Sequence, residues 1–353
     1  MKVAVIGGGV VGAAVTLALA RRGIETVLLE AETDLGLAAS GTNSGILHTG
    51  FDSIPGALET RLIHRSMALR ETVLGALGVP VLRCGAEMRD APDAVVEGAA
   101  VNGVAVERDT DGTLHIPGEW VTDPVVFTLA LAAAAERSRA TLRTGFRVAA
   151  VDGDRLLSTT GDQEVVDLVC NCAGLQADDV ARLFGDTSFA IYPRKGEFFV
   201  FDVPLDRILL PVPSTRTKGV LVFPTVNGGC VAGPTAIDGE DKDDWSVRPA
   251  ARDEVLATAI LMHPALKGIE PVASYAGLRP AGRDANYVID RSSVSRRLLN
   301  VAAIRSTGVS AALGIAAYVA DLIAPGVPEQ ALIPGPAPVL DGPWWARATA
   351  HRA

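Results

Sequence analysis

Positive charge is in short supply in this sequence. The 353 residues include 32 Lys and Arg against 41 Asp and Glu, which gives a formal net charge of -9. A nucleic-acid-binding protein would need a basic face, so the sequence predicts no nucleic-acid partner. A small anionic substrate stays open, because the charge that lines a cleft can oppose the net charge of the chain.

Cysteine is also scarce, since only Cys84, Cys170, Cys172 and Cys230 are present. Cys170 and Cys172 are two residues apart in an apolar run, so on a strand their side chains would face the same side. Free cysteine usually packs as a small buried hydrophobe. Because CxxC pairs and cysteine clusters are missing, the sequence predicts neither a metal site nor an iron–sulfur centre.

Long hydrophobic runs are missing as well. No stretch reaches the 18 uncharged apolar residues of a membrane span, and the longest run is residues 309–320. Met1 and Lys2 lead directly into an apolar run without a signal-peptide pattern. We therefore expect a cytoplasmic protein. Trp344 and Trp345 in the Pro-rich tail allow peripheral contact with the inner face of the membrane, although packing on the protein body is favoured.

The N-terminus carries a dinucleotide-binding pattern. Residues 3–6 form a short apolar run, and Gly7, Gly9 and Gly12 follow it with the spacing GxGxxG. The first glycine makes a tight turn, the second lets backbone approach a pyrophosphate, and the third lets a helix pack closely on a strand. The free N–H groups and positive dipole end of the helix then face the phosphates.

The residues after this motif complete a Rossmann βαβ unit. A helix is predicted over residues 13–22, Gly23 ends it, and a second strand at residues 26–29 leads to Glu30. Glu30 stands about 20 residues after the motif, where an acid accepts hydrogen bonds from ribose hydroxyls. An acidic side chain here disfavours a 2′-phosphate, so NADP is not expected.

Two later segments favour FAD over NAD. Residues 39–50 are small, polar and glycine-rich, and they follow the second strand, where a chain could run along a long cofactor. Residues 165–174 form a late apolar strand ending in Ala-Gly, which would return beside the first strand. The predicted cofactor-binding residues outside the βαβ unit are Ser40, Asn43, Ser44, Ala173, Gly174 and Gly308.

Hydrophobic residues make up 48% of the chain, enough to bury the core of two interleaved domains. The patterns predict helices at residues 56–77, 124–137, 177–184, 253–262 and 308–323, with strands over 79–106 and 190–235. The fold class is α/β, with a discontinuous Rossmann-type FAD-binding domain and an α+β substrate domain on a mostly antiparallel sheet. The expected FAD-binding domain comprises residues 1–80, 146–190 and 276–330, the substrate domain residues 81–145 and 191–275, and the tail residues 331–353.

The three cofactor segments together resemble the D-amino-acid-oxidase-like superfamily of FAD-dependent oxidoreductases, over about residues 1–325. Further segments resemble its branch of glycerol-3-phosphate and L-2-hydroxyglutarate dehydrogenases or oxidases. The matching segments are residues 43–48, 194–199, 219–225, 233–236, 277–280 and 304–310. Thr307 stands where that branch usually has proline. The long cysteine-bearing C-terminal extension of some members is missing, so a partner subunit or iron–sulfur relay is not implied.

His48 is the candidate catalytic base. Oxidation of a secondary alcohol needs a hydride acceptor, here the flavin N5, and a base for the hydroxyl proton. His48 is the only histidine in the glycine-rich loop, and histidine titrates near neutral pH. The alternative is that His48 only hydrogen-bonds the loop; the resemblance favours the catalytic role.

Arg279 is the candidate anion clamp, because a guanidinium can hold carboxylate or phosphate through two parallel hydrogen bonds. Lys195 and Arg305 are weaker candidates for the same anion. Ser306 and Ser310 could contact substrate or flavin, although serine before a helix more often caps it.

Three functions follow from these observations. The first is an alcohol-oxidising flavoenzyme acting on a small anionic hydroxy compound, with glycerol 3-phosphate ahead of a 2-hydroxy acid. The second is an amine or amino-acid oxidase of the same fold, and the third a non-catalytic flavin-binding subunit. Oxygen, quinone and a carrier protein all remain open as electron acceptor. Non-covalent FAD is expected, because the early cofactor loop contains no cysteine.

Overall fold

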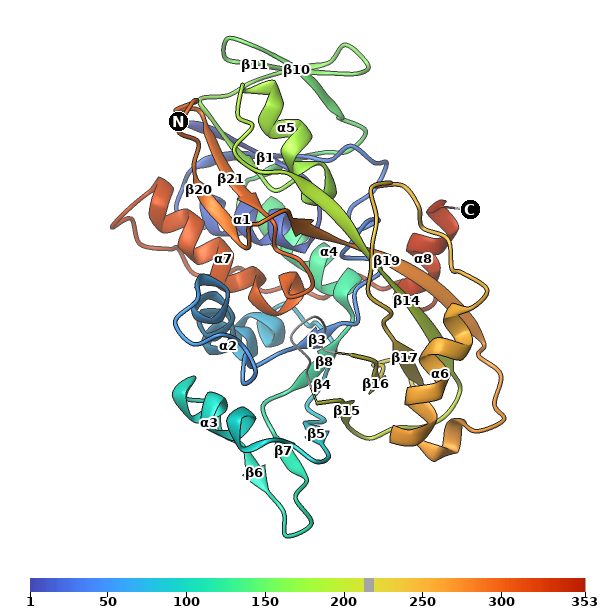
Figure 1. The fold of residues 1–353 in the computed structure, drawn as a ribbon. Helices are drawn as coiled ribbons and strands as arrows, with labels where there is room; N and C mark the ends of the chain where they lie inside the picture. Colours follow the sequence, from blue (N-terminus) through green and yellow to red (C-terminus); the bar gives the residue numbers. More distant parts are fainter. Residues whose placement is uncertain (213–218, 353) are drawn as a thin grey trace.

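The computed structural model describes residues 1–212 and 219–352. Its first strand lies inside a six-stranded sheet (Figure 1), in which all neighbours run parallel except β20 and β21. The predicted late strand β13 does return beside β1, with Val3 opposite Leu168. The strands, in spatial order, are β20 (Val288–Arg291), β21 (Leu298–Ala302), β13 (Leu168–Asn171), β1 (Lys2–Ile6), β2 (Glu25–Leu29) and β9 (Thr141–Arg143).

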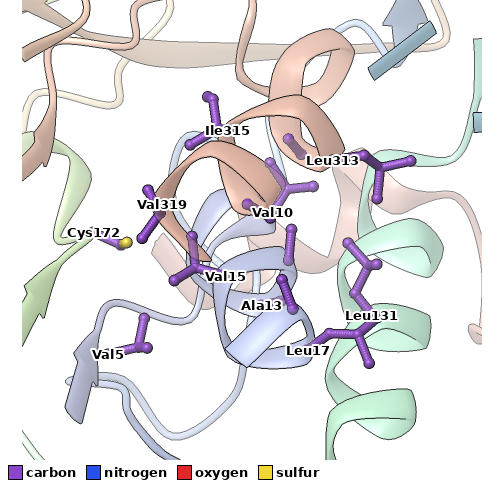
Figure 2. Close-up of a cluster of buried hydrophobic side chains, with 14 of the residues drawn as sticks. Val5, Val10, Ala13, Val15, Leu17, Leu131, Cys172, Leu313, Ile315 and Val319 are labelled. Atoms are coloured by element: carbon purple, nitrogen blue, oxygen red, sulfur yellow. The ribbon is translucent and has the colours of Figure 1, made fainter. Parts of the chain in front are cut away.

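Helices pack together beside this sheet. The first helix, α1 (Val10–Arg21), packs against both α4 (Pro124–Arg137) and α7 (Gly308–Ile323). Figure 2 shows the apolar side chains of α1 meeting Leu131 of α4 and Ile315 and Val319 of α7. α2 (Leu58–Ala76) packs against α7 in turn. This buried cluster holds the start of α1 rigidly at the edge of the sheet.

The start of α4 follows from its sequence. Asp123 caps the helix, because its Oδ1 accepts hydrogen bonds from the N–H groups of Val125 and Val126, both at 2.9 Å. Pro124 occupies the first helical position, where its missing N–H costs nothing. The predicted start of this helix is therefore confirmed.

A second, mostly antiparallel sheet lies beside the first, as the sequence predicts. Its spine is β14 (Ile191–Phe201), which pairs with β19 (Ala273–Gly282) from Ile191 to Val200. Only β15 and β5 pair in parallel within it. The remaining order is β18 (Ile237–Asp238), β14, β17 (Cys230–Gly233), β16 (Leu221–Pro224), β15 (Ile208–Leu210), β5 (Ala86–Met88), β7 (Leu114–Ile116) and β6 (Glu107–Arg108).

Two three-stranded sheets and several short helices complete the described chain. The sheets are β10 (Val148–Asp152), β11 (Arg155–Ser158) and β12 (Gln163–Val165), and β3 (Ile46–Leu47), β8 (Trp120–Thr122) and β4 (Val81–Leu82). The helices are α3 (Asp93–Val101), α5 (Ala177–Leu183), α6 (Ala251–Met262), α8 (Trp344–Arg352) and the 3-10 turns η1 (Gly174–Gln176) and η2 (Pro264–Leu266).

One secondary-structure prediction is wrong. The strands expected over residues 79–106 include β4 and β5, but α3 replaces the rest. Pro92 precedes this helix, and Asp93 lies in its first turn, where a negative charge is favourable. Most of α3 is exposed, so its apolar pattern resembles the alternation of a half-buried strand.

The domain division remains a proposal, and the sheets argue for two changes to it. β9 pairs with β2, and α4 packs on α1, so residues 124–143 go with the FAD-binding sheet instead of the substrate domain. The start of the last cofactor segment changes as well, because β19 belongs to the second sheet up to Gly282.

The tail ends on the body of the protein. Trp344 is fully buried and Trp345 is 8% exposed, and the Trp345 ring stacks on Tyr275 with centroids 6.3 Å apart. This confirms the favoured interpretation and removes these two rings as a membrane contact.

None of the helices in residues 1–212 and 219–352 has the length and apolar character needed to cross a bilayer. Cys170 and Cys172 are buried, as predicted; Cys230 is buried as well, and Cys84 is half-buried.

Candidate active site

A cavity of about 610 Å³ opens at the carboxyl ends of β1, β2 and β13. This edge of a parallel sheet is where doubly wound folds bind their ligands. Nine of the ten predicted cofactor residues line it, namely Gly7, Gly9, Gly12, Glu30, Ser40, Asn43, Ala173, Gly174 and Gly308. The tenth, Ser44, lines an adjoining cavity instead.

The three positions of the motif require glycine for different physical reasons. A Cβ on Gly12 would lie 1.9 Å from the carbonyl oxygen of Gly7, and one on Gly7, at φ +109°, would lie 2.4 Å from the carbonyl oxygen of Cys172. Both positions therefore need glycine for packing. A Cβ on Gly9 would meet only the Ser40 hydroxyl, at 3.0 Å. Gly9 is thus the one that keeps the cavity side of the turn open for a phosphate.

Glu30, the predicted ribose contact, lines the same cavity. One carboxylate oxygen accepts the N–H of Gly8 at 2.5 Å, and the other accepts the N–H of Glu32 at 2.9 Å. Burial raises the pKa of Glu30, although these hydrogen bonds lower it. Two residues further along the turn, the Ser40 hydroxyl accepts the first N–H of α1 from Val10 at 2.9 Å. The open turn, the helix N-terminus and the acid together fit an adenine dinucleotide.

A second cavity of about 260 Å³ adjoins the first, because Ala39, Asn43 and Arg305 line both. The cofactor loop and the turn before α7 form one wall, and β14, β16 and β19 of the second sheet form the other. The apolar part of the wall includes Phe198 and Phe223. The polar groups that line this cavity include His48, Arg194, Arg279, Arg305 and Ser306.

His48 is held by a carboxylate that the sequence did not reveal. The Nδ1 of His48 lies 2.7 Å from Oε2 of Glu119, whose side chain is fully buried. The other oxygen of Glu119 accepts the N–H of Thr49 at 2.6 Å and its hydroxyl at 2.8 Å. The backbone N–H of His48 is fixed by Ser310 Oγ at 2.9 Å. Because a carboxylate only accepts, Nδ1 carries the proton and Nε2 keeps its lone pair.

The charge of Glu119 is compensated inside the protein. Burial alone would raise its pKa, but the attraction of His48 and the hydrogen bonds from His48 and Thr49 lower the pKa below the usual range. Arg70 is also buried, donates to the carbonyls of Leu47 and Gly118, and lies over the Trp120 ring at 4.0 Å. No local pattern around Glu119 could have identified it, since β8 brings it to His48 only through pairing with β3.

Arg279 presents a guanidinium to the same cavity. Nη2 donates to the carbonyls of Thr235 at 2.6 Å and Lys195 at 3.3 Å, while no carboxylate among the described residues lies within ion-pair distance. Burial and the nearby charge of Arg194 together lower the pKa of Arg279 to about 10, partly opposed by Asp238, so the group is still cationic at neutral pH. Glycine at position 196 makes room, because a Cβ there would lie 2.3 Å from this guanidinium.

The other predicted substrate residues divide into two groups. Arg305 and Ser306 line the second cavity, with Arg305 paired to Glu59 at 3.1 Å. Ser310 is buried behind His48, and Lys195 donates to Asp244 at 2.5 Å on the opposite face of β14. Neither lines the cavity. Successive side chains of a strand point to opposite faces, so the cation that β14 presents to the cavity is Arg194, which sequence reasoning missed.

The family described as FAD dependent oxidoreductase matches residues 2–322. The chain belongs to this family, which confirms the resemblance seen in the sequence; the protein is an oxidoreductase and FAD is its cofactor. A glycerol 3-phosphate dehydrogenase of Caloramator mitchellensis is 28% identical over 353 aligned residues, covering 91% of this chain and 73% of that protein. A glycine oxidase of Geobacillus kaustophilus is 26% identical, covering 91% and 92%.

A solved structure confirms the fold. The dithionite-reduced L-α-glycerophosphate oxidase of Mycoplasma pneumoniae, with FAD bound, superposes with a TM-score of 0.86 at 23% identity. The match covers 96% of this chain and 99% of that one. The α/β fold class predicted from the sequence is therefore correct.

Proposed function

We propose that this protein oxidises the secondary alcohol of a small anionic hydroxy compound, with glycerol 3-phosphate favoured and a 2-hydroxy acid next. The observation that carries the proposal is one cavity that holds a carboxylate-bound histidine and a guanidinium without a carboxylate partner among the described residues. An alcohol that loses a hydride must also lose a proton, and an anionic substrate needs a cationic contact. The relative from Caloramator mitchellensis supports the favoured substrate.

His48 accepts the hydroxyl proton at Nε2. FAD, when bound, supplies the acceptor for the hydride. Glu119 keeps the proton of the neutral imidazole on Nδ1, and it stabilises the imidazolium that forms when Nε2 takes the second proton. Ser310 accepts the backbone N–H of His48 and Glu119 accepts that of Thr49, so the ring is preorganised for this step.

Arg279 binds the anionic group and so orients the substrate. No carboxylate of the described chain forms an ion pair with it, and two backbone carbonyls hold the guanidinium in place. A guanidinium held in this way is preorganised for a phosphate or a carboxylate. The apolar wall from Phe198 and Phe223 excludes water around the reacting carbon.

An amino-acid oxidase remains the alternative, and the glycine oxidase of Geobacillus kaustophilus supports it. Arg279 would bind the carboxylate of an amino acid equally well. The His48–Glu119 pair favours the alcohol, because a neutral amine carries its own lone pair and needs no base of this kind. A non-catalytic flavin-binding subunit would not need the pair at all.

We propose that FAD is bound without a covalent link. Cys172 is the one cysteine that lines the larger cavity in the described chain, and burial raises its pKa well above the usual value. A thiol that stays protonated is a poor nucleophile.

Oxygen, a quinone and a carrier protein remain candidate electron acceptors. A cytoplasmic location remains the prediction.

Flavin reduction without air tests the proposal. The purified holoenzyme is mixed with glycerol 3-phosphate, L-2-hydroxyglutarate, lactate, glycine, D-alanine and neutral glycerol, and flavin absorbance is followed. We expect bleaching with an anionic hydroxy compound and little with glycerol. Reduction by an amino acid alone would replace the proposal with the oxidase alternative, and reduction by none of them would favour the non-catalytic subunit.

A further inference from the structure

The C-terminal helix α8 packs against the outside of the segment that follows β2, residues 32–43, which leads into the cofactor loop. Residues 36–40 and Asn43 of this segment line the larger cavity. Trp344 donates its indole N–H to the carbonyl of Asn43 at 3.1 Å. Ala348 packs so closely on the loop that a Cβ on Gly41 would lie 3.1 Å from its own Cβ.

Charged contacts extend this clamp toward β2. Arg347 donates to the carbonyl of Leu35 at 3.2 Å and forms an ion pair with Asp34. His351 lies 3.0 Å from Glu32, which follows the ribose-binding Glu30 by two residues. One helix therefore contacts the segment between Glu32 and Asn43 at several points.

The last described residue of α8 reaches the cavity itself. Arg352 lies over the ring of Trp245 at 4.5 Å, and both side chains line the larger cavity. Trp245 lies in the loop that follows β18. The Nε of Arg352 and the Nε1 of Trp245 are buried donors without a hydrogen-bond partner in the described chain.

Arg352 differs from the other cations of this cavity in having no ion-pair partner among the described residues. The other cationic side chains that line it each pair with a carboxylate: Arg147 with Glu32, Lys242 with Asp178 and Asp179, and Arg305 with Glu59. Among the described residues, Arg352 has no carboxylate within ion-pair distance. A dinucleotide pyrophosphate carries two negative charges, which such a cation would complement.

We propose that α8 is part of the FAD site: Arg352 binds the pyrophosphate directly, and the rest of the helix holds residues 32–43 in the shape that encloses the cofactor. The proposal rests on the use of FAD and not on the substrate. It assigns a role in cofactor binding to a tail for which the sequence favoured packing on the protein body.

Substitution of Arg352 tests the direct contact. In Arg352→Met the side chain keeps an apolar stem for the Trp245 ring but loses its charge, and Arg207→Ala removes an exposed arginine paired with Asp206 as the control. The Kd of FAD for the apoprotein is measured by flavin fluorescence at low and high salt. We expect about a tenfold higher Kd for Arg352→Met at low salt, a smaller difference at high salt because the charge is screened, and no change for the control.

The apoprotein melting temperature separates binding from folding, and it should match that of wild type in Arg352→Met. Wild-type affinity in this variant, or a loss of affinity that salt does not reduce, would overturn the direct contact.

Arg347→Gln tests the clamp through the rate of FAD release, followed by the same flavin fluorescence. Loss of the Arg347 contacts with Asp34 and Leu35 should make FAD dissociate several-fold faster, because the loop opens more easily. Release at the wild-type rate from Arg347→Gln would show that the loop holds its shape without α8.

Discussion

The glycine turn at the start of α1 lines the larger cavity, which adjoins the smaller cavity, yet the residues of the two sites are spread very differently along the chain. The turn is made by Gly7, Gly9 and Gly12 within a single βαβ unit. The proposed chemistry of the smaller cavity needs His48, Glu119 and Arg279, which come from three distant segments of the chain. A site built within one unit is visible as a motif, whereas a site assembled by sheet pairing is visible only residue by residue.

The largest expected effect lies in the turn itself, where two glycines should fail differently. Gly12→Ala places a Cβ 1.9 Å from the Gly7 carbonyl oxygen, so we expect destabilisation of more than about 4 kcal/mol. Gly9→Ala meets only the Ser40 hydroxyl at 3.0 Å, so the apoprotein should fold but lose FAD. Circular dichroism melting and flavin absorbance measure the two effects. If both variants lost stability equally, the distinction between packing and phosphate access would be wrong.

His48→Ala tests the assembled site at its centre. It should keep FAD and the fold, since His48 does not line the dinucleotide cavity. Anaerobic flavin reduction should slow by roughly 10²–10⁴-fold, the usual worth of a positioned base. Stopped-flow reduction at near wild-type rate would show that another group or water takes the proton.

Glu119→Gln tests the residue that sequence reasoning missed. An amide can donate to Nδ1 and so favour the wrong tautomer, which should lower kcat by about 10²-fold and leave KM nearly unchanged. Glu119→Asp should restore part of the rate. A kcat equal to that of wild type would mean that Glu119 only packs against the loop.

Arg279 and Lys195 provide the smallest and most specific test, because they lie on paired strands but face different environments. Arg279→Ala should remove about 2–3 kcal/mol of binding free energy for the anionic substrate, which raises KM on the order of 30- to 150-fold. Lys195→Ala should change KM little, because its ammonium binds Asp244 away from the cavity. Steady-state kinetics with both variants decide which cation contacts the substrate; an equal rise in KM would return Lys195 to the site.

Local patterns predicted the elements with short-range causes. The helix start at residue 124, the glycine motif after β1, and the helix at residues 308–323 all appear in the structure. The strand prediction for the region of α3 was wrong because an exposed amphipathic helix and a half-buried strand have similar apolar content. The membership of β9 was missed because strand order in a parallel sheet depends on crossovers and not on chain proximity.

The sequence by itself determined the glycine turn and the acid after the second strand, because each depends on residue type and spacing within one unit, and it predicted His48 as the proton acceptor. Only the tertiary structure decided that Glu119 orients His48, that β14 presents Arg194 to the cavity while Lys195 faces away, and that Arg352 reaches the cofactor cavity. These decisions depend on strand pairing and on the packing of a distant helix. Hydrogen bonds and charges act over a few ångströms of space, and separation along the chain does not enter into them.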